Sequence, residues 1–102
     1  MALDIHTKEG DHWIYGIDSG EYGHLYELFT LFYQQSGIMF DEYCDPSPLT
    51  VGHQKLMLKL IDKDIEQTDL NKDKAKTVTI IKFKALLEYG IKHNIELCFV
   101  GD

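Results

Sequence analysis

Histidines and carboxylates are the side chains of this sequence that can do chemistry, because they bind metals and transfer protons when they converge. The chain has 5 histidines and 17 aspartates and glutamates. No two histidines stand in an HxxxH or HExxH spacing, and the nearest pair, His6 and His12, flanks a glycine turn. We therefore expect no metal site and no cofactor.

The two cysteines do not indicate a redox motif or a nucleophile. Cys44 and Cys98 are 54 positions apart and form no CxxC pair. Cys98 stands in an apolar C-terminal run, where a buried structural thiol is expected. This spacing favours two buried thiols in a reducing compartment, although a single bridge between them stays open.

Nothing in the sequence indicates a phosphate-binding or nucleic-acid-binding site. The segment from Gly16 to Gly20 precedes a predicted helix but lacks GxGxxG and the Lys-Ser/Thr pair of a P-loop. Asp18 and Glu21 would repel a phosphate at that helix start. All 10 basic residues are lysine, whereas arginine is the usual residue for bidentate phosphate and guanine contacts. We expect no direct contact with nucleic acid.

The formal net charge of −7 is concentrated in the first half of the chain. Residues 1–48 hold nine acids and one lysine, whereas residues 49–102 hold nine lysines and eight acids. Nine of the twelve aromatic residues also lie in 1–48. This distribution predicts a surface that docks onto a basic partner, because carboxylates attract cations over long range and tyrosines are flat amphipathic anchors. The residues expected to bind that partner are Asp18, Glu21, Tyr22, Tyr26, Glu27, Asp41, Glu42, Tyr43 and Asp45.

A purely structural reading of some of these residues stays open. Asp18 and Glu21 have the spacing of a capping box, which explains both of them without a partner. Tyr22, Tyr26 and Tyr33 fall in one wide apolar stripe over 21–35 with Leu25, Leu28, Phe29 and Phe32. On the structural reading, Tyr22, Leu25, Phe29 and Phe32 are core.

Six elements are expected around these residues. They are a strand at 12–17, a helix at 21–35, a strand or extended segment at 38–44, a helix at 50–67, a helix that covers at least 83–93, and a strand at 95–100. Ser47 is the expected N-cap of the second helix, with Pro48 at its first position. The β-branched run at 77–82 leaves strand and helix open, and Asn94 is expected to stop the last helix in a left-handed conformation.

The order of these elements predicts an α/β or α+β fold. We expect residues 1–102 to form a single small domain, with a three- to four-stranded sheet packed by about three helices. The N-terminus lacks the basic start and apolar run of a signal peptide, and no segment has the roughly 20 apolar residues of a membrane span. The expected location is the cytoplasm.

Two short segments resemble inhibitors of bacterial ribonucleases. The stretch from Trp13 to Gly20 is similar to a Gly-Ile-Asp-x-Gly segment in the immunity protein of a tRNA-cleaving colicin. Residues 21–25 and 83–100 are similar to parts of barstar-type inhibitors, which carry an additional helix for which there is no room here between Ile17 and Glu21. No inhibitory residue is transferred from that family.

The resemblance implies a small acidic immunity protein of a bacterial toxin system, of the contact-dependent-inhibition or colicin type. Such a protein would not be an enzyme. It would bind a basic nuclease toxin, most readily an RNase, one to one and cover its active-site cleft. Two alternatives stay open: a small enzyme or ligand-binding domain with a cleft lined by Tyr15, His24 and Glu27, and a homo-oligomeric module whose tyrosines pack against a symmetry mate.

Overall fold

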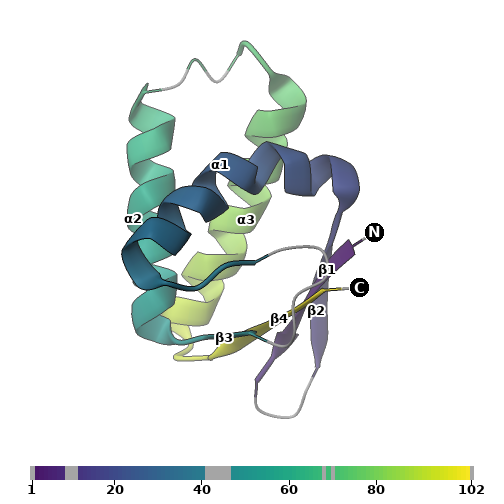
Figure 1. Ribbon diagram of the computed structural model, residues 1–102, viewed down its shortest axis with the longest axis vertical. Coiled ribbons are helices and arrows are strands. Elements are labelled where there is room, and N and C mark those ends of the chain that lie inside the picture. The colour runs from purple at the N-terminus through teal and green to yellow at the C-terminus, as the bar shows by residue number, and fades with distance from the viewer. Residues whose placement is uncertain (1, 9–11, 41–46, 68, 70, 102) are drawn as a thin grey trace.

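The protein is an α+β domain in which three helices pack against one four-stranded antiparallel sheet (Figure 1). The computed structural model describes residues 2–8, 12–40, 47–67, 69 and 71–101. The strands are β1 (Ala2–Thr7), β2 (Trp13–Asp18), β3 (Ser47–Leu49) and β4 (Leu97–Gly101), and the helices are α1 (Ser19–Ser36), α2 (Val51–Gln67) and α3 (Lys74–Lys92). The expected fold class and the numbers of strands and helices are confirmed.

The N-terminal strand β1, which the sequence analysis missed, lies at the centre of the sheet. The strand order is β2-β1-β4-β3, so β1 pairs with β2 on one side and with the C-terminal strand on the other. Its side chains alternate, since Leu3 and Ile5 are fully buried whereas Asp4 and His6 are half-buried. This alternation is too short to stand out in the sequence, and β1 becomes a central strand by pairing with both β2 and β4.

Helix α1 has the boundaries that its local residues dictate. Asp18 Oδ1 accepts a hydrogen bond of 2.8 Å from the Glu21 backbone N–H, and Glu21 Oε1 accepts one of 3.3 Å from the Asp18 N–H, which completes a capping box. Gly37 ends the helix at a φ of 77°, a left-handed conformation in which a Cβ is strained. Leu25, Phe29 and the other buried side chains of α1 lie on one stripe.

The predicted cap of the second helix is wrong. Ser47 and Pro48 belong to β3, which pairs with β4 through Pro48 opposite Cys98. Proline is tolerated there because β3 is an edge strand with one neighbour. The cap is Thr50, whose Oγ1 accepts a hydrogen bond of 3.2 Å from the His53 N–H.

The run at 77–82 is helical, which settles the open choice between strand and helix. Asp73, four residues before the β-branched run begins, caps α3 by accepting a hydrogen bond of 3.1 Å from the Lys76 N–H. Thr79 and Ile80 are buried and continue the face of Phe83 and Leu87. Asn94 follows α3 at a φ of 54°, so its predicted left-handed conformation is confirmed.

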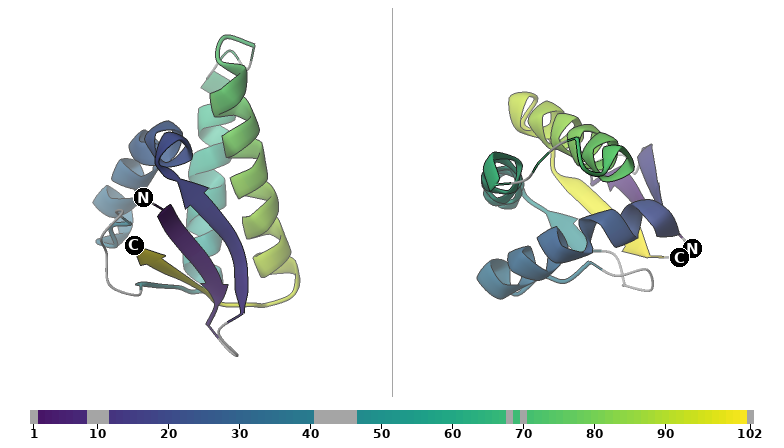
Figure 2. Two further views of the ribbon diagram at one scale, coloured as in Figure 1. Left: turned by 90° about the vertical axis from the view of Figure 1, so that its right-hand side faces the viewer. Right: turned by 90° about the horizontal axis from the view of Figure 1, so that it is seen from above.

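Five phenylalanines from the helices, β4 and the segment after α1 form the centre of the core. Phe29 of α1 contacts Phe83 of α3 at 5.6 Å between ring centroids, and Phe83 contacts Phe99 of β4 at 6.1 Å. Phe40 stacks on Phe99 at 4.3 Å. Because Phe29 and Phe83 meet between their helices, the outer faces of α1 and α3 point away from each other, as Figure 2 shows.

Candidate protein-binding surface

Asp18 and Glu21, two of the expected partner-binding acids, have structural roles at the start of α1. Beyond the capping box, Glu21 Oε2 accepts a hydrogen bond of 2.6 Å from the Tyr15 hydroxyl on β2. Glu21 is half-buried and Asp18 is exposed. Together these contacts tie the helix to the sheet, so the two carboxylates are not free to reorganise around a cation.

The phenol of Tyr15 is strongly held in its neutral form. Partial burial raises its pKa, and the hydrogen bond to Glu21 and the negative charges of Glu21 and Asp18 raise it further. A neutral hydroxyl that donates to a carboxylate is a positioning contact, not a proton-transfer group at neutral pH.

Tyr22 is also largely structural. Its hydroxyl donates a hydrogen bond of 2.8 Å to the carbonyl oxygen of Phe40, and its ring packs 5.7 Å from that of Phe29. It reaches the surface only in part, with its ring edge against Tyr26 at 6.2 Å. All three predicted residues nearest the helix start, Asp18, Glu21 and Tyr22, therefore make contacts within the protein.

Tyr26 and Glu27 lie together on the outside of α1. They line a shallow groove of about 350 Å³ with Thr30 and Leu31, and Tyr33 lies one turn beyond. Tyr26, Leu31 and Tyr33 are each 44–52% exposed, so three large side chains are exposed on one helix within eight residues. We call these five residues, Tyr26, Glu27, Thr30, Leu31 and Tyr33, the α1 face.

The charge of the α1 face comes from one of its five side chains, the carboxylate of Glu27. Helix α1 contains two glutamates and no lysine, and no basic residue lies in its last turn. The Thr30 hydroxyl donates to the Tyr26 carbonyl oxygen at 2.9 Å, so it offers a partner only acceptor capacity. An exposed carboxylate beside a phenol ring suits a lysine or arginine side chain, through ionic and cation–π attraction.

The structure brings together only part of the predicted set. Tyr26 and Glu27 share the α1 face, while Asp18, Glu21 and Tyr22 lie toward the start of the same helix. Asp41, Glu42, Tyr43 and Asp45 lie outside the described residues, as does Cys44. Thr30, Leu31 and Tyr33 were not among the predicted binding residues, although the position of Thr30 and Leu31 outside the apolar stripe was a usable signal.

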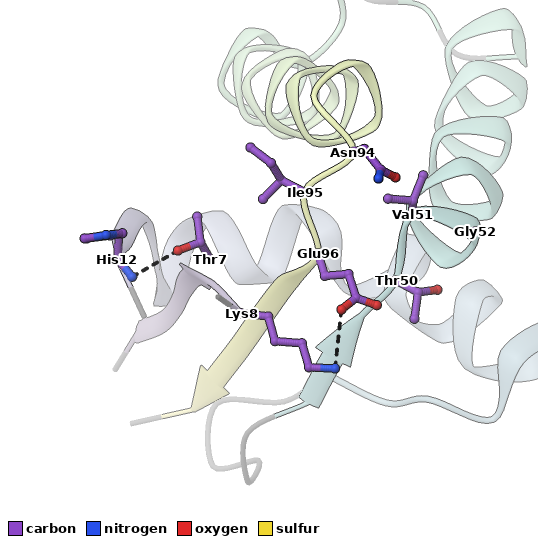
Figure 3. Close-up of a pocket in the computed structure, with 9 residues that line it drawn as sticks. All are labelled: Thr7, Lys8, His12, Thr50, Val51, Gly52, Asn94, Ile95 and Glu96. Carbon is purple, nitrogen blue, oxygen red and sulfur yellow. Dashed lines mark hydrogen bonds and ion pairs between the residues drawn. The ribbon is translucent and has the colours of Figure 1, made fainter. Parts of the chain in front are cut away.

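A larger pocket of about 830 Å³ lies at one end of the sheet, where the start of α2 meets β1 and β4 (Figure 3). Lys8 and Glu96 point toward each other in it and form an ion pair of 3.4 Å. The Thr7 hydroxyl accepts a hydrogen bond of 3.0 Å from the His12 N–H, and Thr50 is used as the cap of α2. The pocket's opposite charges neutralise each other, so it favours neither an anion nor a cation.

The enzyme alternative expected a cleft lined by Tyr15, His24 and Glu27, and the structure shows the surroundings of two of these side chains. The Tyr15 hydroxyl is bound to Glu21, and the groove that Glu27 lines is built by α1 residues alone. Within the described ranges, no three histidine, cysteine, aspartate or glutamate side chains are close enough to hold a metal ion.

No helix in the described part of the chain is both long and apolar enough to cross a bilayer. Comparison with known proteins adds no relative: no family model, no curated protein and no solved structure matches the chain.

Proposed function

We propose that this protein is a cytoplasmic immunity protein that binds a basic nuclease toxin domain, in the first instance an RNase, and blocks its active-site cleft. The observation that carries the proposal is the α1 face. It exposes three large apolar or aromatic side chains around a carboxylate, on a helix that contains no lysine.

The physical case rests on complementarity with a cationic cleft. A nuclease cleft must be positive to hold phosphates, so an inhibitor that presents carboxylates and flat rings can occupy the same site. The net charge of −7 speeds the encounter with such a partner, which matters when the toxin must be captured before it reaches its substrate. The half-exposed Tyr26 supplies a rigid anchor with little entropy to lose.

The fold supports this use because it holds the α1 face rigidly. The capping box and the Tyr15–Glu21 hydrogen bond secure the start of α1, and four buried side chains, Leu25, Leu28, Phe29 and Phe32, secure its inner face. A preorganised helix face costs little to order on binding, which favours tight and specific association.

The test uses the reading frame immediately upstream of the one for this chain. We expect a large secreted protein with a basic C-terminal domain, and that purified domain is the probe. Titration of its RNA cleavage with this protein should end at one equivalent, and calorimetry should give one-to-one binding. Absence of binding and of inhibition would show that the proposal is wrong.

A further inference from the structure

Helix α3 carries a second exposed surface whose charge is opposite to that of α1. Val78, Ile81 and Tyr89 are each 49–52% exposed, and Ala85 between them is also exposed. Their positions follow the helical repeat, so they form one continuous apolar line along the outside of the helix. Lys74 and Lys92 lie at its two ends and Lys82 beside it, all exposed. We call these seven residues, Lys74, Val78, Ile81, Lys82, Ala85, Tyr89 and Lys92, the α3 stripe.

The charge balance of α3 is what distinguishes the stripe. The helix contains five lysines and one glutamate, in a protein whose net charge is −7. Lys84 pairs with Asp62 of α2 at 2.8 Å, but Lys84 lies off the stripe, toward α2. The described structure assigns no ion pair to Lys74, Lys82 or Lys92, so three exposed lysines surround the apolar line, against one exposed acid beside it, Glu88.

From these observations we infer that the α3 stripe docks onto the α1 face of a second copy of this protein, head to tail. The two surfaces match in kind: each presents exposed apolar or aromatic side chains along one helix, and their charges are opposite. Two α3 stripes would instead face lysine against lysine, which opposes a symmetric α3–α3 dimer.

The contact must be between copies because one copy cannot make it internally. Phe29 and Phe83 bring the inner faces of α1 and α3 together at 5.6 Å between ring centroids, which directs the outer faces apart. Figure 2, in the view from above, shows the two helices at opposite sides of the molecule. A contact of this heterologous type leaves one α1 face and one α3 stripe free at the ends, so copies add into short chains or close into a ring.

Two helix faces bury less than the roughly 1,600 Å² of a standard interface, so the expected association is weak. We would measure the weight-average mass by sedimentation equilibrium or light scattering, from about 10 µM to about 1 mM, where micromolar to millimolar constants are visible. The mass should rise steadily with concentration. A constant monomer mass over this range would overturn the inference.

Charge-reversal variants distinguish the effect of a local contact on association from the effect of the net charge. Glu27→Lys on α1 changes the net charge from −7 to −5, which reduces general repulsion between copies, yet it should weaken association about threefold to tenfold. Glu66→Lys, the matched control on the exposed surface of α2, makes the same change in charge and should not weaken it. If both variants associate more strongly than the parent protein, the local contact is absent.

The complementary pair is Lys82→Glu on the α3 stripe and Lys63→Glu on the exposed surface of α2. Both substitutions raise the general repulsion between copies equally. If Lys82→Glu associates more weakly than Lys63→Glu, the difference comes from a local contact of Lys82. Circular dichroism and thermal unfolding verify that all four variants are folded.

Mixing the Glu27→Lys and Lys82→Glu variants tests the head-to-tail arrangement directly. The Glu27→Lys copy keeps its α3 stripe, the Lys82→Glu copy keeps its α1 face, and the two reversed surfaces are again opposite in charge, so the mixture should associate more strongly than either variant alone. A symmetric α3–α3 dimer would persist in Glu27→Lys alone, and that result would overturn the head-to-tail arrangement. These measurements involve no toxin, so their failure leaves the proposed immunity function standing.

Discussion

The side chain of Gln54 in α2 lies directly against Gly90 in α3. Gln54 is fully buried, and its Nε2 donates hydrogen bonds of 3.1 Å to the Leu49 carbonyl oxygen and 2.7 Å to that of Ile95. These two bonds join the end of β3 to the segment that leads into β4. A Cβ on Gly90 would stand 3.1 Å from Gln54 Cδ and closer still to Oε1. The amide has no room to retreat, because both of its donor contacts hold it.

Replacing Gly90 with alanine should therefore destabilise the protein by about 1–3 kcal/mol, as overpacking does. The sign of this change in the free energy of unfolding is informative, because Gly→Ala in a helix interior ordinarily stabilises a protein by about 0.5–1 kcal/mol. Gly23→Ala in α1 is the matched control, since a Cβ there meets nothing within 4 Å and should stabilise. Urea denaturation measures both.

A double mutant verifies the cause of the Gly90 effect. In a Gln54→Ala background, which removes the clashing amide, Gly90→Ala should lose most of its cost. An unchanged cost would show that Gln54 is not the obstacle.

Tyr15→Phe should lower stability by about 1 kcal/mol at neutral pH, because Glu21 Oε2 loses its 2.6 Å donor from β2. The difference from the parent protein should also depend on pH. The pKa of Tyr15 is raised in the folded state by burial and by Glu21, above the value near 10 expected when unfolded.

A raised pKa means that folding favours the protonated phenol. The contribution of the Tyr15 phenol to the free energy of unfolding is complete below pH 10. It declines as the pH rises from there toward the folded-state pKa. Stability measured at pH 8, 9.5 and 10.5 should decline more steeply in the parent protein than in Tyr15→Phe. Parallel curves would contradict this assignment.

Asn94 should tolerate glycine better than alanine. Its φ of 54° places it in the left-handed region, where alanine costs about 1 kcal/mol and glycine little. The Ile95 N–H donates a hydrogen bond of 2.8 Å to the Gly90 carbonyl oxygen across this turn, so the conformation is fixed by the end of α3. Thermal unfolding of Asn94→Ala and Asn94→Gly compares the two directly.

Binding of the proposed toxin domain should respond differently to Tyr26 and Glu27. Glu27→Lys should slow association and weaken its dependence on salt, whereas Tyr26→Ala should mainly speed dissociation, by about tenfold for a loss of 1.4 kcal/mol. Glu66→Lys on α2 carries the same change in net charge and controls for general attraction. Stopped-flow fluorescence or biolayer interferometry separates the two rates.

Equal slowing by Glu27→Lys and Glu66→Lys would place the toxin somewhere other than the α1 face. Glu21→Gln is expected to act on folding stability, because Glu21 caps α1 and accepts a hydrogen bond from Tyr15. It should lower stability more than it changes the binding rates.

The sequence by itself determined the features that depend on residues a few positions apart. The Asp18–Glu21 capping box and the left-handed Asn94 are local, since each needs only its own backbone and neighbours three or four residues away. The same is true of the bounds of α1 and α2, which agree with prediction within a few residues. The charge division along the chain was equally readable.

Tertiary structure decided what depends on distant partners. β1 is a central strand only because β4 pairs with it from the other end of the chain, and Ser47–Leu49 is a strand only because β4 offers it an edge. Tyr22 and Tyr26 fall on the same predicted stripe, yet one is bound to Phe40 and the other is half-exposed. Packing alone distinguishes them, because a stripe of periodicity states which side chains share a side of the helix but not how far the core extends around it.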